Sequence, residues 1–74
     1  MKILAFAVAR ERAGFSELEI AVDSSETPRG IMRRVAPELA IESFRAAVDY
    51  EYWDWDNPVG EGKELAIIPA VSGG

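Results

Sequence analysis

The segment Lys2–Ala9 (KILAFAVA) is apolar throughout after its first residue, without the alternation of a strand that has one wet face. Such a run is typical of a central strand covered on both faces. It is also too short to span a membrane. The chain has 74 residues and no cysteine that could form a disulfide. The sequence therefore predicts one small domain, residues 1–74, organised around this strand.

The next two segments predict a partner strand. Arg10–Ser16 is polar around Gly14 and is expected to form a turn. Glu17–Val22 (ELEIAV) alternates between polar and apolar residues, the pattern of a half-buried strand. The fold is therefore expected to begin with a hairpin.

One main helix is predicted after the hairpin. Thr27 is suited to cap the helix and Pro28 to occupy its first position. Apolar residues recur at near-helical spacing from 31 to 39, and Pro37 is expected to end or kink the helix. A short turn over 40–44 is expected to follow.

The last third of the chain predicts the remaining strands. Arg45–Tyr52 has β character, Trp53–Gly62 is expected to be a loop, and Leu65–Pro69 reads as a short final strand. The order predicts an α+β fold, a mixed sheet of four to five strands with one main helix packed on one face. A right-handed crossover would place the first and last strands parallel and adjacent.

Composition excludes several kinds of site. Without His or Cys the chain lacks the commonest nucleophile–base pairs and the soft metal ligands, so no metal site is predicted. The net charge is -5 and the eight basic residues form no stripe, so nucleic acid is not an expected partner. No signal-peptide pattern or membrane-length segment occurs, and a cytoplasmic protein without membrane contact is expected.

Two further groups of side chains are expected to be structural. The indoles of Trp53 and Trp55 should lean on the core while the neighbouring aspartates face solvent. Four acidic residues are expected to form a solvated face: Glu38, Glu42, Asp49 and Glu51. None of these acids is predicted to be catalytic.

The face of the sheet away from the helix is a candidate interaction surface. If Ile3, Ala5 and Ala7 point toward the helix, Phe6 points away. The same alternation in the last strand turns Leu65 and Ile67 inward and Ile68 outward. Contiguous exposed apolar residues mark a partner surface. Tyr52 and Val59 are expected to complete this surface.

The sequence ends on two glycines directly after the last predicted strand. Residues 70–74 (AVSGG) are expected to form a flexible tail. Because Gly73 and Gly74 have no side chains, the tail can thread a slot too narrow for other residues. The Gly74 carboxylate is then the only reactive group that the tail can present.

The segment Leu65–Gly74 (LAIIPAVSGG) closely resembles the C-terminus of the small subunits of molybdopterin synthase, which end in an apolar strand, Pro-Pro-Val, Ser or Thr, and Gly-Gly. Ala70 stands where that family usually has its second proline. The segments around Phe6–Gly14 and Asn57–Leu65 also resemble the family, so the likeness spans the chain. The resemblance implies a ubiquitin-like β-grasp fold.

The resemblance also implies a role for the tail. An enzyme similar to ubiquitin-activating enzymes would use ATP and Mg²⁺ to adenylate the Gly74 carboxylate, and a sulfur donor would convert the adenylate to a thiocarboxylate. The large subunit would bind the charged tail, including Gly73, and the sulfur would pass to cyclic pyranopterin monophosphate. Pro69, Val71 and Ser72 are expected to contact that partner. The chain is expected to bind no cofactor and to have no activity alone.

Three other functions remain open at this point. The chain could carry sulfur for thiamine or for tRNA thiolation, since those carriers share the fold and Gly-Gly. It could be a ubiquitin-like modifier joined through Gly74 to lysines of other proteins. It could also be an interaction domain whose terminal glycines are incidental.

Overall fold

The computed structural model describes residues 1–70, which form one mixed sheet with two α-helices and a short 3-10 helix. The strands are β1 (Lys2–Ala5), β2 (Glu17–Glu19), β3 (Phe44–Val48), β4 (Glu51–Trp53) and β5 (Glu64–Pro69). The helices are α1 (Ala7–Ala13), α2 (Pro28–Val35) and the 3-10 helix η1 (Ile41–Ser43). The strand order is β2-β1-β5-β3-β4. The central pair β1 and β5 is parallel, as predicted, and the other pairs are antiparallel.

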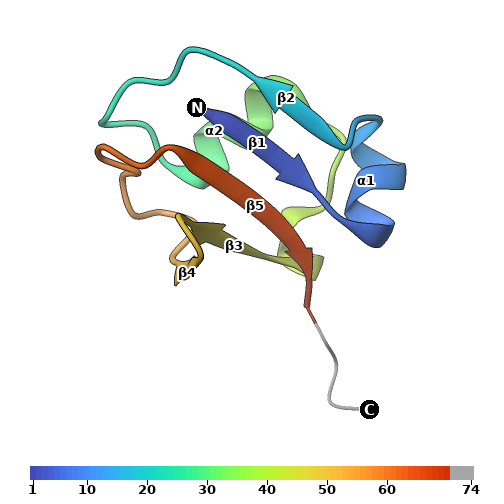
Figure 1. Cartoon of the computed structure of the whole chain (residues 1–74). Coiled ribbons are helices and arrows are strands. Elements are labelled where there is room, and N and C mark those ends of the chain that lie inside the picture. Colours follow the sequence, from blue (N-terminus) through green and yellow to red (C-terminus); the bar gives the residue numbers. More distant parts are fainter. Residues whose placement is uncertain (71–74) are drawn as a thin grey trace.

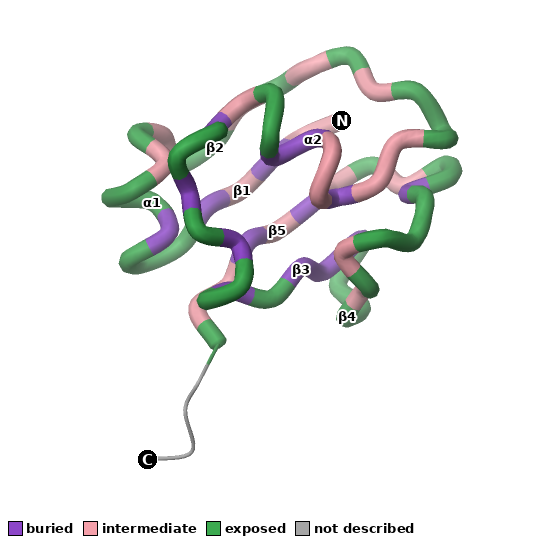
Figure 2. The backbone as a smooth tube through the Cα atoms, turned by 180° about the vertical axis from the view of Figure 1, so that it is seen from behind, coloured by how far each residue is buried: buried purple, intermediate pink, exposed green. Residues whose placement is uncertain are grey.

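Helix α2 lies across one face of the sheet, behind it in Figure 1 and in front of it in Figure 2. Helix α1 lies at the end of the sheet, beyond the carboxyl end of β1 (Figure 1). The opposite face is therefore left uncovered by the helices of residues 1–70. We call it the outward face.

The core lies between the sheet and α2. Strand pairing arranges the inward residues in two rows across β1, β5 and β3: Ile3, Leu65 and Val48, then Ala5, Ile67 and Ala46. Helix α2 supplies Ile31 and Met32, which are both fully buried. The predicted inward orientation of Ile3, Ala5, Leu65 and Ile67 is confirmed.

The ends of α2 follow the predicted signals. The Thr27 hydroxyl accepts a hydrogen bond from the Gly30 N–H at 3.1 Å, and Pro28 occupies the first helical position. At the other end the Ala36 N–H donates to the Met32 carbonyl at 2.8 Å. The helix thus ends before Pro37, whose ring could not continue the helix.

The prediction of one strand over Lys2–Ala9 is wrong. The chain turns at Phe6, whose carbonyl accepts the N–H groups of Ala9 and Arg10 at 2.9 and 3.3 Å. The resulting helix α1 ends at Gly14, which has a left-handed φ of 86°. Ala7 begins this helix and is exposed, so its predicted inward orientation is also wrong. The predicted turn over Arg10–Ser16 is largely this helix.

The single strand predicted over Arg45–Tyr52 is also incorrect. Asp49 and Tyr50 have φ of 49° and 72° and form a two-residue turn between β3 and β4. Asp49 is exposed, but its Oδ1 accepts the N–H groups of Lys63 and Glu64, both at 3.0 Å. Its carboxylate therefore ties the turn to the start of β5 and does more than face solvent.

The indoles pack as predicted. Trp53 Nε1 donates to the Asn57 carbonyl at 3.0 Å, and Trp55 Nε1 donates to the Phe44 carbonyl at 3.2 Å. Both side chains are half-buried against the core.

Substitution of Gly62 is expected to lower stability. A Cβ at this position would lie 2.5 Å from Val48 Cγ1 and 3.1 Å from the Val59 carbonyl oxygen. Relieving that contact requires the core to shift, so Gly62→Ala should lower the free energy of unfolding by about 1–3 kcal/mol. Gly30→Ala is the matched control, because its Cβ meets only Thr27 Oγ1 at 3.4 Å and alanine favours a helix. Equal urea midpoints for Gly62→Ala and wild type would contradict the close packing.

Candidate functional site

The outward face carries a row of side chains between the two buried rows. Pairing places Leu4 beside Ala66, Ala66 beside Ala47, and Ala47 beside Tyr52, across β1, β5, β3 and β4. The two central members are alanines, whose side chains are short, so the surface is hollowed at the middle of this face relative to its margins. A sheet built in this way leaves room for a side chain from another molecule.

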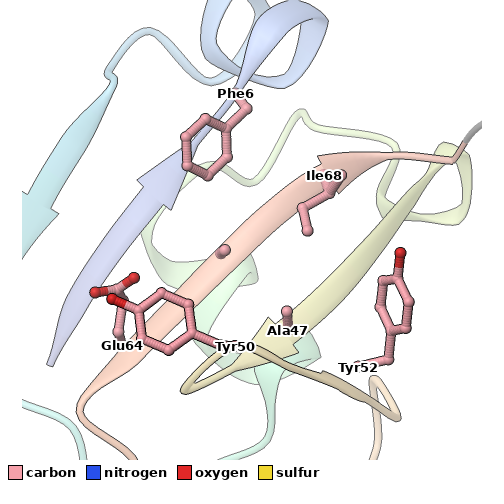
Figure 3. A pocket seen from close by; sticks show the side chains of 7 residues that line it. Phe6, Ala47, Tyr50, Tyr52, Glu64 and Ile68 are labelled. Atoms are coloured by element: carbon pink, nitrogen blue, oxygen red, sulfur yellow. The ribbon is translucent and has the colours of Figure 1, made fainter.

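A pocket of about 360 Å³ lies over these alanines. We call it the aromatic pocket. Its lining residues come from the β1–α1 junction, β3, β4, β5 and the β3–β4 turn, namely Phe6, Ala47, Tyr50, Tyr52, Glu64, Ala66 and Ile68. Figure 3 shows Phe6 and Ile68 at one end, Tyr50 and Glu64 at the other, and Ala47 between the two tyrosines.

The rings that wall the aromatic pocket are exposed. Phe6 is 48% exposed, Tyr52 64% and Tyr50 89%. Exposed large apolar side chains that gather around one hollow are typical of a surface that binds another molecule. Scattered single residues would need no such explanation.

Arg45 does not line the aromatic pocket but contacts Tyr52, which does. Its Cζ is 3.8 Å from the centre of the Tyr52 ring, a cation–π contact that favours one orientation of both side chains. In the strand register Arg45 lies beside Ile68. None of the ion pairs found among residues 1–70 includes Arg45.

Acid–base chemistry is not concentrated at the aromatic pocket. Hydrogen bonds from Ser25 lower the pKa of Asp23, and the hydrogen bonds from Arg29 lower the pKa of Asp56. Asp56 in turn raises the pKa of Arg29. None of these three residues lines the aromatic pocket.

The part of the chain that the structure describes contains no cluster of acidic residues able to hold a metal ion. None of the helices within residues 1–70 is long and apolar enough to cross a membrane.

The structure brings three of the predicted partner-binding residues together. Phe6, Tyr52 and Ile68 line the same pocket, although they are far apart in sequence. Pro69 lies at the end of β5, half-buried and paired with Phe44. The chain then leaves the sheet at Ala70, whose N–H donates to the Ser43 carbonyl at 3.2 Å.

The prediction that Val59 lies on the outward face is wrong. Val59 is only 3% exposed and packs in the core, and its N–H donates to the Glu26 carbonyl at 2.8 Å. A lone apolar residue in a polar loop often anchors that loop to the core, and Val59 does so.

The other predicted site residues lie outside the described part of the chain. They are Val71, Ser72, Gly73 and Gly74. The prediction of a flexible tail over residues 70–74 also falls outside it, except for Ala70.

Tyr50, Arg45 and Glu64 are not among the site residues that the sequence predicts. Tyr50 lies inside the strand predicted over Arg45–Tyr52, so the sequence does not predict its position in a turn at the pocket. A signal was present, because Asp is one of the residues that tolerate a left-handed turn position. Arg45 becomes notable only once its ring partner on the next strand is known.

Comparison with known proteins gives a consistent result. The profile of the ThiS family matches residues 3–74. The molybdopterin synthase sulfur carrier subunit of Escherichia coli (strain K12) is 33% identical over 81 residues, covering 100% of this chain and 99% of that protein.

Solved structures agree in fold. A putative molybdopterin converting factor, subunit 1, from Pyrococcus furiosus has a TM-score of 0.72 at 22% identity, with 95% of each chain covered. SAMP1 from Haloferax volcanii has a TM-score of 0.71 at 24% identity, covering 99% of this chain and 97% of that one. At these identities the likeness shows the fold alone, and it confirms the predicted β-grasp class.

Proposed function

Because the chain belongs to the ThiS family and is a sulfur carrier, we propose that it is the small subunit of a molybdopterin synthase. The observation that carries this proposal is the course of β5. The strand contributes Ile68 to the aromatic pocket and leads, within six residues, to the terminal Gly73-Gly74. One segment therefore joins a surface suited to docking with a carboxylate suited to activation.

The chemistry of the proposal begins with the Gly74 carboxylate. Its oxygen attacks the α-phosphorus of ATP on a partner enzyme, pyrophosphate leaves, and the carboxylate becomes an acyl-adenylate. Hydrosulfide released by a sulfur donor then attacks the carbonyl carbon and AMP leaves, which yields a thiocarboxylate. In the large subunit the thiocarboxylate sulfur forms a bond to a carbon of cyclic pyranopterin monophosphate, and water then cleaves the bond between this sulfur and the Gly74 carbonyl carbon, which restores the carboxylate. Storing sulfur covalently divides one difficult transfer into easier steps.

In this scheme the fold sets the distance between the docking surface and the Gly74 carboxylate. Gly74 is the sixth residue after Ile68, so the carboxylate can reach at most about 22 Å from that position. A partner that docks on the aromatic pocket must hold its active site within that distance. Neither His nor Cys is available on this chain for the transfer itself, so acid–base groups are supplied by the partners.

The intact mass of the protein isolated from its native cells tests the proposed function. Replacement of one carboxylate oxygen by sulfur should add about 16 Da, and a fragment spectrum should place the increase on Gly74. A matched sample from cells that lack the activating enzyme should show only the unmodified mass. Ladders of conjugates with Gly74 joined to lysines, without the thiocarboxylate, would favour a protein modifier instead.

A further inference from the structure

We propose that Tyr50 is a binding contact for the large subunit, and that the Asp49–Tyr50 turn presents its ring at the pocket for this purpose. This inference rests on the proposed function. It extends the docking surface from the tail end of β5, at Ile68, to the opposite end of the strand, at Glu64.

The backbone of Tyr50 has a strained conformation. Its φ of 72° lies in the left-handed region, which disfavours any residue with a Cβ and is usually occupied by glycine in such turns. Asp49 shares this conformation, but its carboxylate accepts hydrogen bonds from the N–H groups of Lys63 and Glu64, and these bonds compensate for the backbone strain.

Tyr50 has no comparable compensation within residues 1–70. Its side chain is 89% exposed, and none of the hydrogen bonds among residues 1–70 involves its hydroxyl. A strained residue with little buried surface points to a function outside its own domain.

The course of the chain indicates what covers Tyr50. Gly74 lies five residues beyond Pro69, so a protein that receives Gly74 must approach within about 18 Å of the end of β5. A standard interface buries about 800 Å² per partner, equivalent to a disc of roughly 16 Å radius. Tyr50 lies beside Glu64, about 13 Å along β5 from Ile68. A protein that binds the tail and also covers the aromatic pocket would therefore contact Tyr50.

The pocket indicates the chemistry of that contact. Its floor is the alanine pair Ala47 and Ala66, and the rings of Tyr50 and Tyr52 stand on either side of Ala47 (Figure 3). A large apolar side chain of the partner fits this space and would contact both rings. Aromatic residues give such contacts a large area with few rotatable bonds. Arg45 contacts the Tyr52 ring, while the turn sets the backbone conformation of Tyr50.

Three substitutions of Tyr50 test the inference. Tyr50→Gly removes the ring and the strain, Tyr50→Ala removes the ring and keeps the strain, and Tyr50→Phe keeps the ring. Binding to the purified large subunit, measured by calorimetry, should weaken about tenfold for the first two and stay within about threefold for Tyr50→Phe. The melting temperature of Tyr50→Gly should exceed that of Tyr50→Ala by about 4 °C.

Two outcomes overturn the inference alone. Wild-type affinity of Tyr50→Gly, in a series where Phe6→Asp weakens binding by about thirtyfold or more, would show that the partner does not reach Tyr50. A melting temperature of Tyr50→Gly at or below that of Tyr50→Ala would remove the argument from strain. If the wild-type protein itself fails to bind the large subunit, the proposed function is wrong and the inference falls with it.

Discussion

Deletion of Gly74 is expected to abolish sulfur loading of the chain while leaving the domain folded. The deletion moves the terminal carboxylate back by about 3.5 Å, whereas a misplacement of about 1 Å can already slow a reaction about a hundredfold. Loading should be measured as thiocarboxylate formed with the activating enzyme, ATP and a sulfur donor, by intact mass. We expect a decrease of at least about a hundredfold.

The fold should not respond to this deletion. All of the helices and strands within residues 1–70 end before the tail, and β5 ends at Pro69. The melting temperature should therefore change by less than about 2 °C. Addition of one alanine after Gly74 should have the same effect on loading as the deletion. Ala70→Ser is the matched control, because Ala70 is exposed and the substitution keeps the tail length. Normal loading of the shortened chain would show that Gly74 is not the site of activation.

The sheet and the main helix could be predicted because their signals are local. Thr27 and Pro28 mark the start of α2, Pro37 follows its end, and the alternation of Leu65 and Ile67 identifies the inward side of β5. Each of these patterns has one ordinary structural meaning.

Helix α1 was missed because short apolar runs are ambiguous between strand and helix. Ile3 and Ala5 follow a period of two, but after Phe6 the buried positions are Ala9 and the half-buried Ala13, four residues apart. The change of period and the following Gly14, which ends the helix, were the available signal. An apolar segment can thus supply a strand and then a helix without any polar break.

The β3–β4 turn was missed for a different reason. The sequence of a two-residue turn normally contains a glycine, and Asp49-Tyr50 has none. Since local sequence does not explain Tyr50 in that position, its explanation has to come from the surface on which it lies. The aromatic pocket is likewise invisible to local patterns, because Phe6, Tyr52 and Ile68 meet only through the pairing of four strands.

Substitution of Phe6 by aspartate is expected to weaken binding of the large subunit by at least about thirtyfold without loss of stability. Phe6 lines the aromatic pocket and is 48% exposed, and loss of an aromatic anchor at an interface costs about 2 kcal/mol or more. Aspartate also introduces a charge at this position, and an apolar side chain of the partner would remove that charge from water. Calorimetric titration of the purified large subunit with the variant measures the effect.

The local structure allows this substitution without loss of stability. Phe6 is the residue before the first turn of α1, with an extended backbone and no side-chain hydrogen bond to the helix. Aspartate is among the best residues at that position, since its carboxylate can accept the free N–H groups of the first turn. The melting temperature should therefore be equal to or above that of the wild type.

Val8→Asp provides the matched control for Phe6→Asp. Val8 lies two residues after Phe6, in the first turn of α1, and is comparably exposed at 41%, but it does not line the aromatic pocket. It receives the same charge in the first turn of α1, so it reproduces the electrostatic change without removing the pocket wall. We expect its affinity to stay within about threefold of the wild type. Equal losses in both variants would mean that the partner responds to charge at this end of the sheet. Full affinity of a folded Phe6→Asp variant would show that the outward face is not where the large subunit binds.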